Sequence, residues 1–265
     1  MRRCILCLYP DTKPDLHFDA EGVCSACRNY QNRPEIDWDQ RKAELYKILE
    51  SAPKNSSGYD CIVASSGGKD STYIVLTLIE FGARPLVVTA STDYLTPMGR
   101  ANIDNLARYA TTIEVTPNRS VRAHLCRLGL ELVGDICWPE HASIFSTPFR
   151  VAAETGIGTI FYGENPQAEY GGPLGAEQAA QMTARWVSEF GGFLGLRPQD
   201  FIGQNGIGIT AADMFDYVLP PEADMAEISA YFLGQFIPWD SWHNARIAEQ
   251  AGLLIPTLPP SRANY

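Results

Sequence analysis

The sequence predicts an α/β protein with a mainly parallel sheet, helices on both faces, and a small metal-binding module at its amino end. Three observations support this. Short apolar runs rich in β-favouring residues alternate with stretches whose apolar residues recur at helical spacing. The turn Gly67-Gly68 joins the first of these runs to the first of these helices, and two Cys-x-x-Cys pairs precede both. The 265 residues, 45% of them hydrophobic, suffice for a sizeable core.

The expected elements follow from this alternation. Four apolar runs are expected to form strands, at 59–65, 85–89, 112–115 and 159–163. Helical spacing is expected to give helices at 38–49, with Asp37 as the N-cap, and at 71–81, 97–109, 119–133 and 148–154. Beyond residue 173 the pattern is less regular, and helices are expected at 175–189, 210–217 and 240–251.

Four segments follow from these elements. They are a four-cysteine zinc module at 1–30, a helix and linker at 31–58, a nucleotide-binding α/β domain at 59–172 and a mostly helical part at 173–265. In a mainly parallel sheet, ligands gather at the carboxyl ends of the strands.

The chemistry is concentrated where the first strand meets the first helix, in Ser66-Gly67-Gly68-Lys69-Asp70-Ser71. Backbone N–H groups at a helix amino end attract phosphate, and glycines let the backbone approach it closely. Ser66 and Ser71 offer hydroxyl groups, and Lys69 offers a positive charge. Asp70 would repel phosphate unless a divalent cation lay between them, so it is assigned to Mg²⁺. The alternative is a Gly-Ser turn that only caps a helix.

This hexapeptide resembles the SGGxDS signature of the PP-loop ATP-pyrophosphatases, including its place after a first strand. The resemblance implies a sheet of the adenine nucleotide alpha-hydrolase-like type. It also implies ATP as cosubstrate, cleaved between its α and β phosphates through a substrate adenylate, with release of AMP and pyrophosphate. Asp70, Lys69 and Glu164 become the catalytic candidates. The sequence lacks the Gly-x-x-x-x-Gly-Lys-Ser/Thr string of P-loop proteins, so γ-phosphoryl transfer is not expected.

The amino-terminal cysteines predict a metal site. Cys4 and Cys7 form one pair, Cys24 and Cys27 the other, and 16 residues separate the pairs. This spacing is typical of two knuckles that share one tetrahedral Zn²⁺. Four thiolates leave no position for water, so the site is expected to be structural. Iron in the same cage, or buried cysteines without metal, are the alternatives.

Within the PP-loop superfamily, the sequence resembles the N-acetyl sugar amidotransferase family. The resemblance lies in the loop and in residues 22–27 (GVCSAC), 137–141 (CWPEH), 163–172 (GENPQAEYGG), 231–234 (YFLG) and 239–240 (WD). It implies a role in surface-polysaccharide biosynthesis, where an acetamido group on an activated amino sugar becomes an acetamidino group. A glutaminase partner would deliver the ammonia, and a homodimer is plausible.

The alternative is a tRNA thiolase of the zinc-knuckle PP-loop type. Such enzymes use additional cysteines for sulfur handling and a basic RNA-binding surface. Here Cys61, Cys126 and Cys137 form no further Cys-x-x-Cys pair, and the formal net charge is −10. This charge opposes binding of a nucleic acid backbone, so no nucleic acid partner is expected.

Further candidates follow the expected strands. After the fourth strand, Glu164 is a candidate metal or second-sphere carboxylate and Asn165 a ligand contact, or both only shape a turn. After the second strand, Thr89, Ser91 and Asp93 are candidates for holding the nucleotide, or form a polar loop.

For the acceptor, the candidates are His141, Glu169, Tyr170 and Trp239. His141, expected in a loop beside Glu140, can relay protons or serve structure, and Trp239 can stack on a sugar or pack in the core. The amino terminus lacks the apolar stretch of a signal peptide, and no run of residues is apolar enough to span a membrane. The sequence therefore predicts a cytoplasmic protein without a membrane partner.

Overall fold

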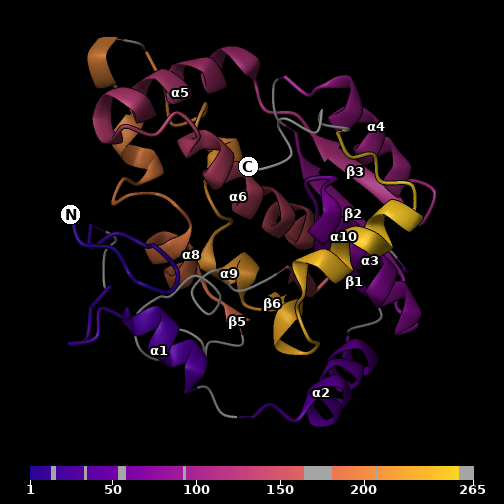
Figure 1. Cartoon of the computed structure of the whole chain (residues 1–265). Helices are drawn as coiled ribbons and strands as arrows, with labels where there is room; N and C mark the ends of the chain where they lie inside the picture. Colours follow the sequence, from indigo (N-terminus) through magenta and orange to yellow (C-terminus); the bar gives the residue numbers. More distant parts are fainter. Residues whose placement is uncertain are drawn as a thin grey trace.

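The computed structural model describes residues 1–12, 16–32, 35–52, 58–91, 94–163, 181–206 and 208–256. Its centre is a six-stranded sheet in the order β3-β2-β1-β4-β6-β5 (Figure 1). The strands are β1 (Cys61–Ala64), β2 (Pro85–Ala90), β3 (Thr111–Val115), β4 (Thr159–Tyr162), β5 (Gln181–Met182) and β6 (Ser229–Phe232). All neighbours pair in parallel except β5, which pairs antiparallel with β6. The predicted α/β class with a mainly parallel sheet is confirmed.

Helices cover both faces of the sheet, as predicted (Figure 1). On one face Val63 of β1 packs with residues of α2 (Trp38–Ser51), α3 (Lys69–Glu80) and α4 (Pro97–Leu106). On the other, Ile62 packs with residues of α5 (Arg119–Val133), α6 (Trp138–Thr155) and α8 (Ala184–Phe190). Since successive residues of a strand point to opposite faces, an apolar run such as β1 supplies both cores.

The connections change face between the two halves of the sheet. The chain runs β1-α3-β2-α4-β3 on one face, then returns through α5 and α6 on the other face to β4, beside β1. In a doubly wound sheet this reversal opens a crevice outside the carboxyl ends of the two central strands. The crevice therefore lies at β1 and β4.

Two elements complete the α/β body. Helix α10 (Ser241–Gln250) packs along α3, and Asp240 caps it by accepting the N–H groups of Trp242 and His243 at 2.8 and 3.1 Å (Figure 1). A short helix α9 (Glu222–Met225) precedes β6. Among the helices that the structure describes, none has both the length and the apolar character needed to cross a bilayer.

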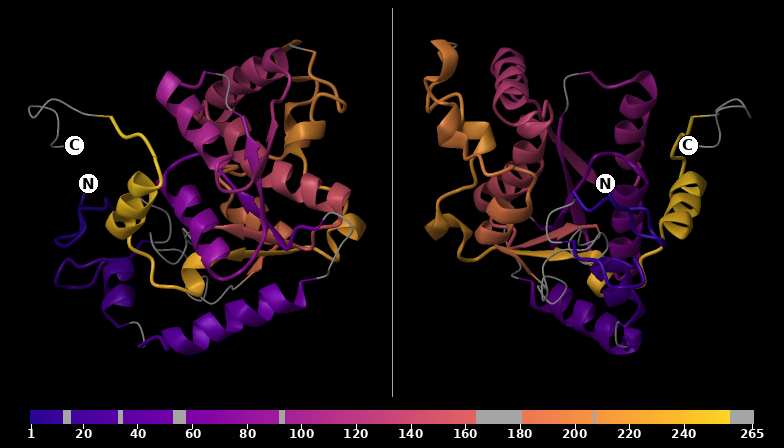
Figure 2. Two further views of the ribbon diagram at one scale, coloured as in Figure 1. Left: turned by 90° about the vertical axis from the view of Figure 1, so that its right-hand side faces the viewer. Right: turned by 60° about the vertical axis from the view of Figure 1, so that its left-hand side comes forward.

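The amino-terminal module has its own small core. Cys4, Leu16, Val23 and Cys24 are buried together, followed by helix α1 (Ser25–Gln31). Figure 2 shows the module, in indigo, at the periphery of the layered body.

Three expectations about secondary structure are wrong. The helix expected at 148–154 begins ten residues earlier as α6, so His141 lies in a helix rather than a loop. Within 175–189, residues Gln181–Met182 form β5 before helix α8 begins, and 164–180 lie outside the described residues. Within 210–217 only Phe215–Tyr217 are helical, as one 3₁₀ turn.

The helical part expected at 173–265 also contributes to the sheet. Strands β5 and β6 both lie beyond residue 172 and extend the sheet next to β4. The remaining helical turns there are η2 (Pro198–Phe201), η3 (Gln204–Gly206), η4 (Phe215–Tyr217) and η5 (Leu233–Gln235). Strand β6 reads Ser-Ala-Tyr-Phe and contains no β-branched residue, so it lacks the signal that the equally short strands β1 and β4 carry.

Pro148 explains why the start of helix α6 was expected at residue 148 and not at Trp138. Proline is common at the first turn of a helix, but here it lies in the interior, where it lacks the N–H that would bond the Ile144 carbonyl. That carbonyl instead accepts the Tyr162 hydroxyl at 3.4 Å. Burial raises the pKa of Tyr162 well above its usual range, so the phenol remains a donor.

Candidate active site

The loop between β1 and α3 has a backbone that requires glycine. Gly67 has φ +76°, and a Cβ there would lie 2.5 Å from Cγ1 of Ile103. The chain therefore turns sharply while α4 packs directly against it. Gly68 is the N-cap of α3 and has no side chain to cover the helix end.

Hydroxyl groups stabilise this turn from within. Ser65 Oγ accepts the Gly67 N–H at 3.1 Å, and Ser66 Oγ accepts the Gly68 N–H at 3.4 Å. Ser71 and Thr72 donate their hydroxyls to the Gly68 carbonyl at 3.2 and 2.9 Å. The first turn of α3 is thus held open towards the sheet edge, where its partial positive charge favours an anion.

A cavity of about 440 Å³ lies in front of this loop. Its wall combines an apolar part with a polar edge at the loop, which is typical of small-molecule sites. The lining residues come from the carboxyl ends of β1, β2 and β4 and from α3, α4 and α6: Ala64, Ser65, Ser66, Asp70, Ser71, Ile74, Val88, Thr89, Ala90, Leu95, Ile103, Glu140, Ile144, Pro148, Tyr162 and Gly163. The cavity therefore occupies the crevice that the topology predicts.

The charged pair of the loop is held by α10. Lys69 Nζ donates to Asp70 Oδ2 and, at 3.1 Å, to Ser241 Oγ. Asn244 Nδ2 donates to Asp70 Oδ1 at 3.1 Å. Both oxygens of the Asp70 carboxylate thus have donors, and two of the contacting residues come from the carboxyl-terminal helix.

A second charged pair lies at the opposite wall. Arg122 of α5 is buried, donates to the Ser91 carbonyl at 3.2 Å, and lies 3.2 Å from a carboxylate oxygen of Glu140. Glu140 lines the cavity. The pair ties the end of β2 to α5 and α6 and places a carboxylate across the cavity from the loop.

Several predicted nucleotide-binding residues come together. Ser66, Asp70, Ser71 and Thr89 all line the cavity, and Gly67 and Gly68 form the turn beside it. Ser91 is buried and is not among the lining residues; its N–H donates to the Val115 carbonyl, and its own carbonyl accepts from Arg122. Asp93, Glu164, Asn165, Glu169 and Tyr170 lie outside the described residues.

Two predicted acceptor contacts lie away from the lining. Nδ1 of His141 is 3.4 Å from Asp135, and its ring lies against Gly192. Trp239 packs edge-on against Tyr73 at 5.8 Å and lies against Gly163, which does line the cavity. No sequence pattern indicates the roles of Asn244, Ser241 and Tyr162.

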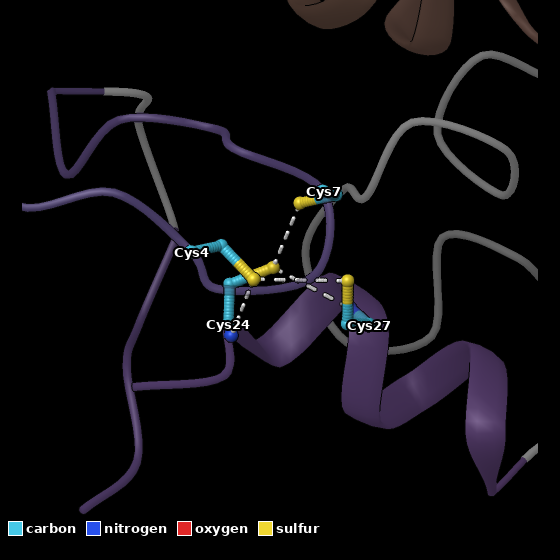
Figure 3. Close-up of side chains that lie close together, drawn as sticks. All are labelled: Cys4, Cys7, Cys24 and Cys27. Carbon is cyan, nitrogen blue, oxygen red and sulfur yellow. Dashed lines mark hydrogen bonds between the residues drawn. The ribbon is translucent and has the colours of Figure 1, made fainter. Parts of the chain in front are cut away.

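The four amino-terminal cysteines converge as their spacing predicts (Figure 3). Their sulfur atoms all lie within 4.8 Å of one another, with Cys4 to Cys27 at 3.9 Å and Cys7 to Cys24 at 3.5 Å. A tetrahedral ion with Zn–S bonds of about 2.3 Å needs sulfurs separated by about 3.8 Å. The four sulfurs therefore fit one tetrahedral metal.

Backbone N–H groups support these thiols as they would support thiolates. Cys4 Sγ accepts from Leu6 and Cys24 at 3.4 and 3.3 Å. Burial alone would raise the pKa of Cys4, but the backbone N–H groups of Cys7, Cys24 and Leu6 outweigh it and lower this pKa to about 6. Burial raises the pKa of Cys27, so metal binding would release a proton there.

Comparisons with known proteins give limited similarity. No family model matches the chain. The uncharacterized protein MJ1599 of Methanocaldococcus jannaschii is 28% identical over 109 residues, which are 40% of this chain and 39% of that relative. The chain thus spans less than half the length of the relative it matches.

Two solved structures are similar at low identity. NMN synthetase from Francisella tularensis has a TM-score of 0.38 and 12% identity, with 85% of this chain and 100% of that chain covered. NAD+ synthetase from Burkholderia pseudomallei has a TM-score of 0.33 and 15% identity, with 86% and 91% covered. Neither similarity identifies a substrate or a reaction for this chain.

Proposed function

We propose that the chain is an ATP-dependent, AMP-forming enzyme of the PP-loop type. The observation that carries this proposal is the SGGKDS loop at the β1 end of the central crevice, where Ser66, Asp70 and Ser71 share one cavity with Thr89. The amino end of a helix that follows a strand suits a polyphosphate, and the apolar part of the wall suits a base.

The residues of the loop have different roles in binding the nucleotide. The N–H groups of the first turn of α3 bind phosphate oxygens, and Lys69 offsets their charge. Asp70, with Glu164 as the second carboxylate expected from the sequence, would hold Mg²⁺, which supplies charge neutralisation on the phosphates. The donor set fits, because the Asp70 carboxylate lines the cavity, and the partner of its Oδ2, Lys69, has a partly exposed side chain able to move to phosphate while Asn244 keeps Oδ1.

For the acceptor we propose an acetamido group of an activated amino sugar. Its carbonyl oxygen attacks the α-phosphorus of ATP, and the bond to the β-phosphate oxygen breaks to release pyrophosphate. Ammonia then attacks the imidate carbon, loses a proton, and expels AMP with the former carbonyl oxygen. The product is an acetamidino sugar, and ATP cleavage makes an otherwise unreactive amide carbon electrophilic.

The partners follow from this chemistry. A glutaminase would supply ammonia, since free ammonia is scarce. The module of four cysteines would bind zinc as a structural site. We propose a cytoplasmic enzyme, where ATP and activated sugars occur, that works as a homodimer without a nucleic acid partner.

The test is an assay with defined acceptors. The protein is mixed with Mg-ATP, ammonium and a panel of diacetamido sugars, and pyrophosphate release is followed with mass spectrometry of the sugar. A product lighter by the difference between O and NH is expected. Asp70→Asn should lose roughly 100-fold or more of the rate. Asp39→Asn, an exposed carboxylate on α2, should behave like the wild type.

Other outcomes would select other functions. Pyrophosphate release that requires tRNA and a sulfur donor would establish the thiolase instead. Nucleotide binding without pyrophosphate under any of these conditions would mean a nucleotide-binding module without catalysis.

A further inference from the structure

Asn244 is a fully buried polar residue at the edge of the candidate site. It lies on α10, and its Nδ2 donates to Asp70 Oδ1 at 3.1 Å, across 174 residues of sequence. Its own Oδ1 is buried and has no hydrogen-bond partner among the described residues. A buried amide with half of its capacity unmet is unfavourable for stability, and an apolar side chain would avoid this. Its presence therefore points to a role other than packing.

The surrounding helix is placed to serve the loop. Helix α10 lies along α3 (Figure 1), and its first residue, Ser241, accepts a hydrogen bond from Lys69 at 3.1 Å. Asp240 caps this end of the helix, and the Asn244 N–H donates to the Asp240 carbonyl at 2.8 Å. The backbone of α10 is thus fixed next to both charged residues of the loop.

The two partners of Asp70 differ in freedom. Lys69 holds Oδ2 with a side chain that is 37% exposed, so it can turn to an arriving phosphate. Asn244 is 0% exposed and cannot move without opening the packing between α10 and α3. When Lys69 leaves, Asn244 remains and prevents the carboxylate from rotating away.

We propose that Asn244 is a positioning residue, which holds Asp70 Oδ1 so that Oδ2 stays directed into the cavity to bind the cation of a magnesium nucleotide. This inference rests on the proposed function for the identity of the cation complex. It makes α10, far from the loop in sequence, part of the nucleotide site. The residues that hold a metal ligand in place commonly affect metal affinity by about 10–100-fold.

The test uses two variants and a matched control. Asn244→Leu keeps the branched outline of the side chain but removes the donor, and Asn244→Ala removes both. Asn105→Ala is the control, because Asn105 also anchors the end of α10, through the Ala251 carbonyl at 3.0 Å, without touching Asp70. The probe is the α,β-methylene analogue of ATP, and its binding is followed by calorimetry over a series of Mg²⁺ concentrations.

The Mg²⁺ concentration for half-maximal binding should rise about tenfold or more in Asn244→Leu, while binding without Mg²⁺ stays unchanged. Asn105→Ala should match the wild type. An equal rise in the control, or no rise in either Asn244 variant, would overturn the proposal.

A second readout does not depend on the proposed function. Crystal structures of Asn244→Leu and the wild type should differ at Asp70, whose carboxylate should turn from the cavity or occupy several orientations in the variant. An unchanged Asp70 would contradict the positioning role. If the wild type binds no nucleotide analogue, the proposed function fails, and the orientation of Asp70 alone decides this inference.

Discussion

Replacing Gly67 by alanine should destabilise the protein for two separable reasons. The residue has φ +76°, a conformation that L side chains rarely adopt. The new Cβ would also lie 2.5 Å from Ile103 Cγ1, 3.1 Å from Ile103 N and 3.2 Å from Ile103 Cα. Because two of these atoms are backbone, rotation of the isoleucine side chain cannot relieve the whole clash.

The two terms have different sizes. The left-handed conformation costs about 1–2 kcal/mol for a residue with a Cβ. Overpacking against α4 adds about 1–3 kcal/mol. The sum, about 2–5 kcal/mol, is a large share of the stability of an ordinary domain. Nucleotide binding should weaken as well, since α4 or the loop must shift at the cavity wall.

Gly82→Ala separates the terms. Gly82 has φ +85°, but a Cβ there meets nothing within 4 Å, so only the conformational cost of about 1–2 kcal/mol applies. Urea unfolding of both variants gives the difference. Ile103→Ala combined with Gly67→Ala should cost less than the sum of the single changes by about 1 kcal/mol, since Cγ1 is gone. Equal destabilisation by Gly67→Ala and Gly82→Ala would show that the contact with Ile103 adds nothing to the cost.

Three further changes test other parts of the structure. Cys24→Ser should lose the metal and lower the melting temperature of the protein, whereas Cys126→Ser should keep one zinc per chain, as measured by atomic emission. Equal metal content in the two variants would contradict the zinc site. Burial, followed by the charge of Glu140, raises the pKa of Cys137, so its alkylation by iodoacetamide should increase with pH with a midpoint above that of an ordinary cysteine. A lower midpoint would mean that the thiolate is favoured. Arg122→Met removes the guanidinium beside Glu140. Because water can partly solvate that carboxylate, which is 34% exposed, the change should cost about 1–3 kcal/mol in urea unfolding, with Glu140→Gln milder. A neutral Arg122→Met would show that the pair is not needed.

Local features of the fold could be predicted from the sequence. The strand, the two glycines and the helix that form the loop are contiguous, so their pattern is complete within residues 59–81. The cysteines likewise converge through short spacings. Such elements depend on neighbours in sequence, which a single chain displays directly.

The missed features depend on packing between distant segments. No local pattern of α10 indicates that Asn244 reaches Asp70, because the contact arises from the placement of α10 against α3. The hydrogen bond from the Tyr162 hydroxyl to the Ile144 carbonyl depends on the position of Pro148 inside α6, because this proline leaves that carbonyl without its helical donor. Arg122 did carry a signal, since it lies three residues before the buried Leu125 on an amphipathic helix. An arginine on a buried helical face indicates a paired or functional charge.

The identity of the nucleotide products shows directly whether the protein cleaves ATP at the α-phosphorus. Phosphorus NMR of a reaction with Mg-ATP and a competent acceptor distinguishes cleavage at the α-phosphorus from cleavage at the γ-phosphorus. AMP and pyrophosphate are expected in equal amounts, with both resonances lost in Asp70→Asn. ADP and inorganic phosphate as the products would contradict it.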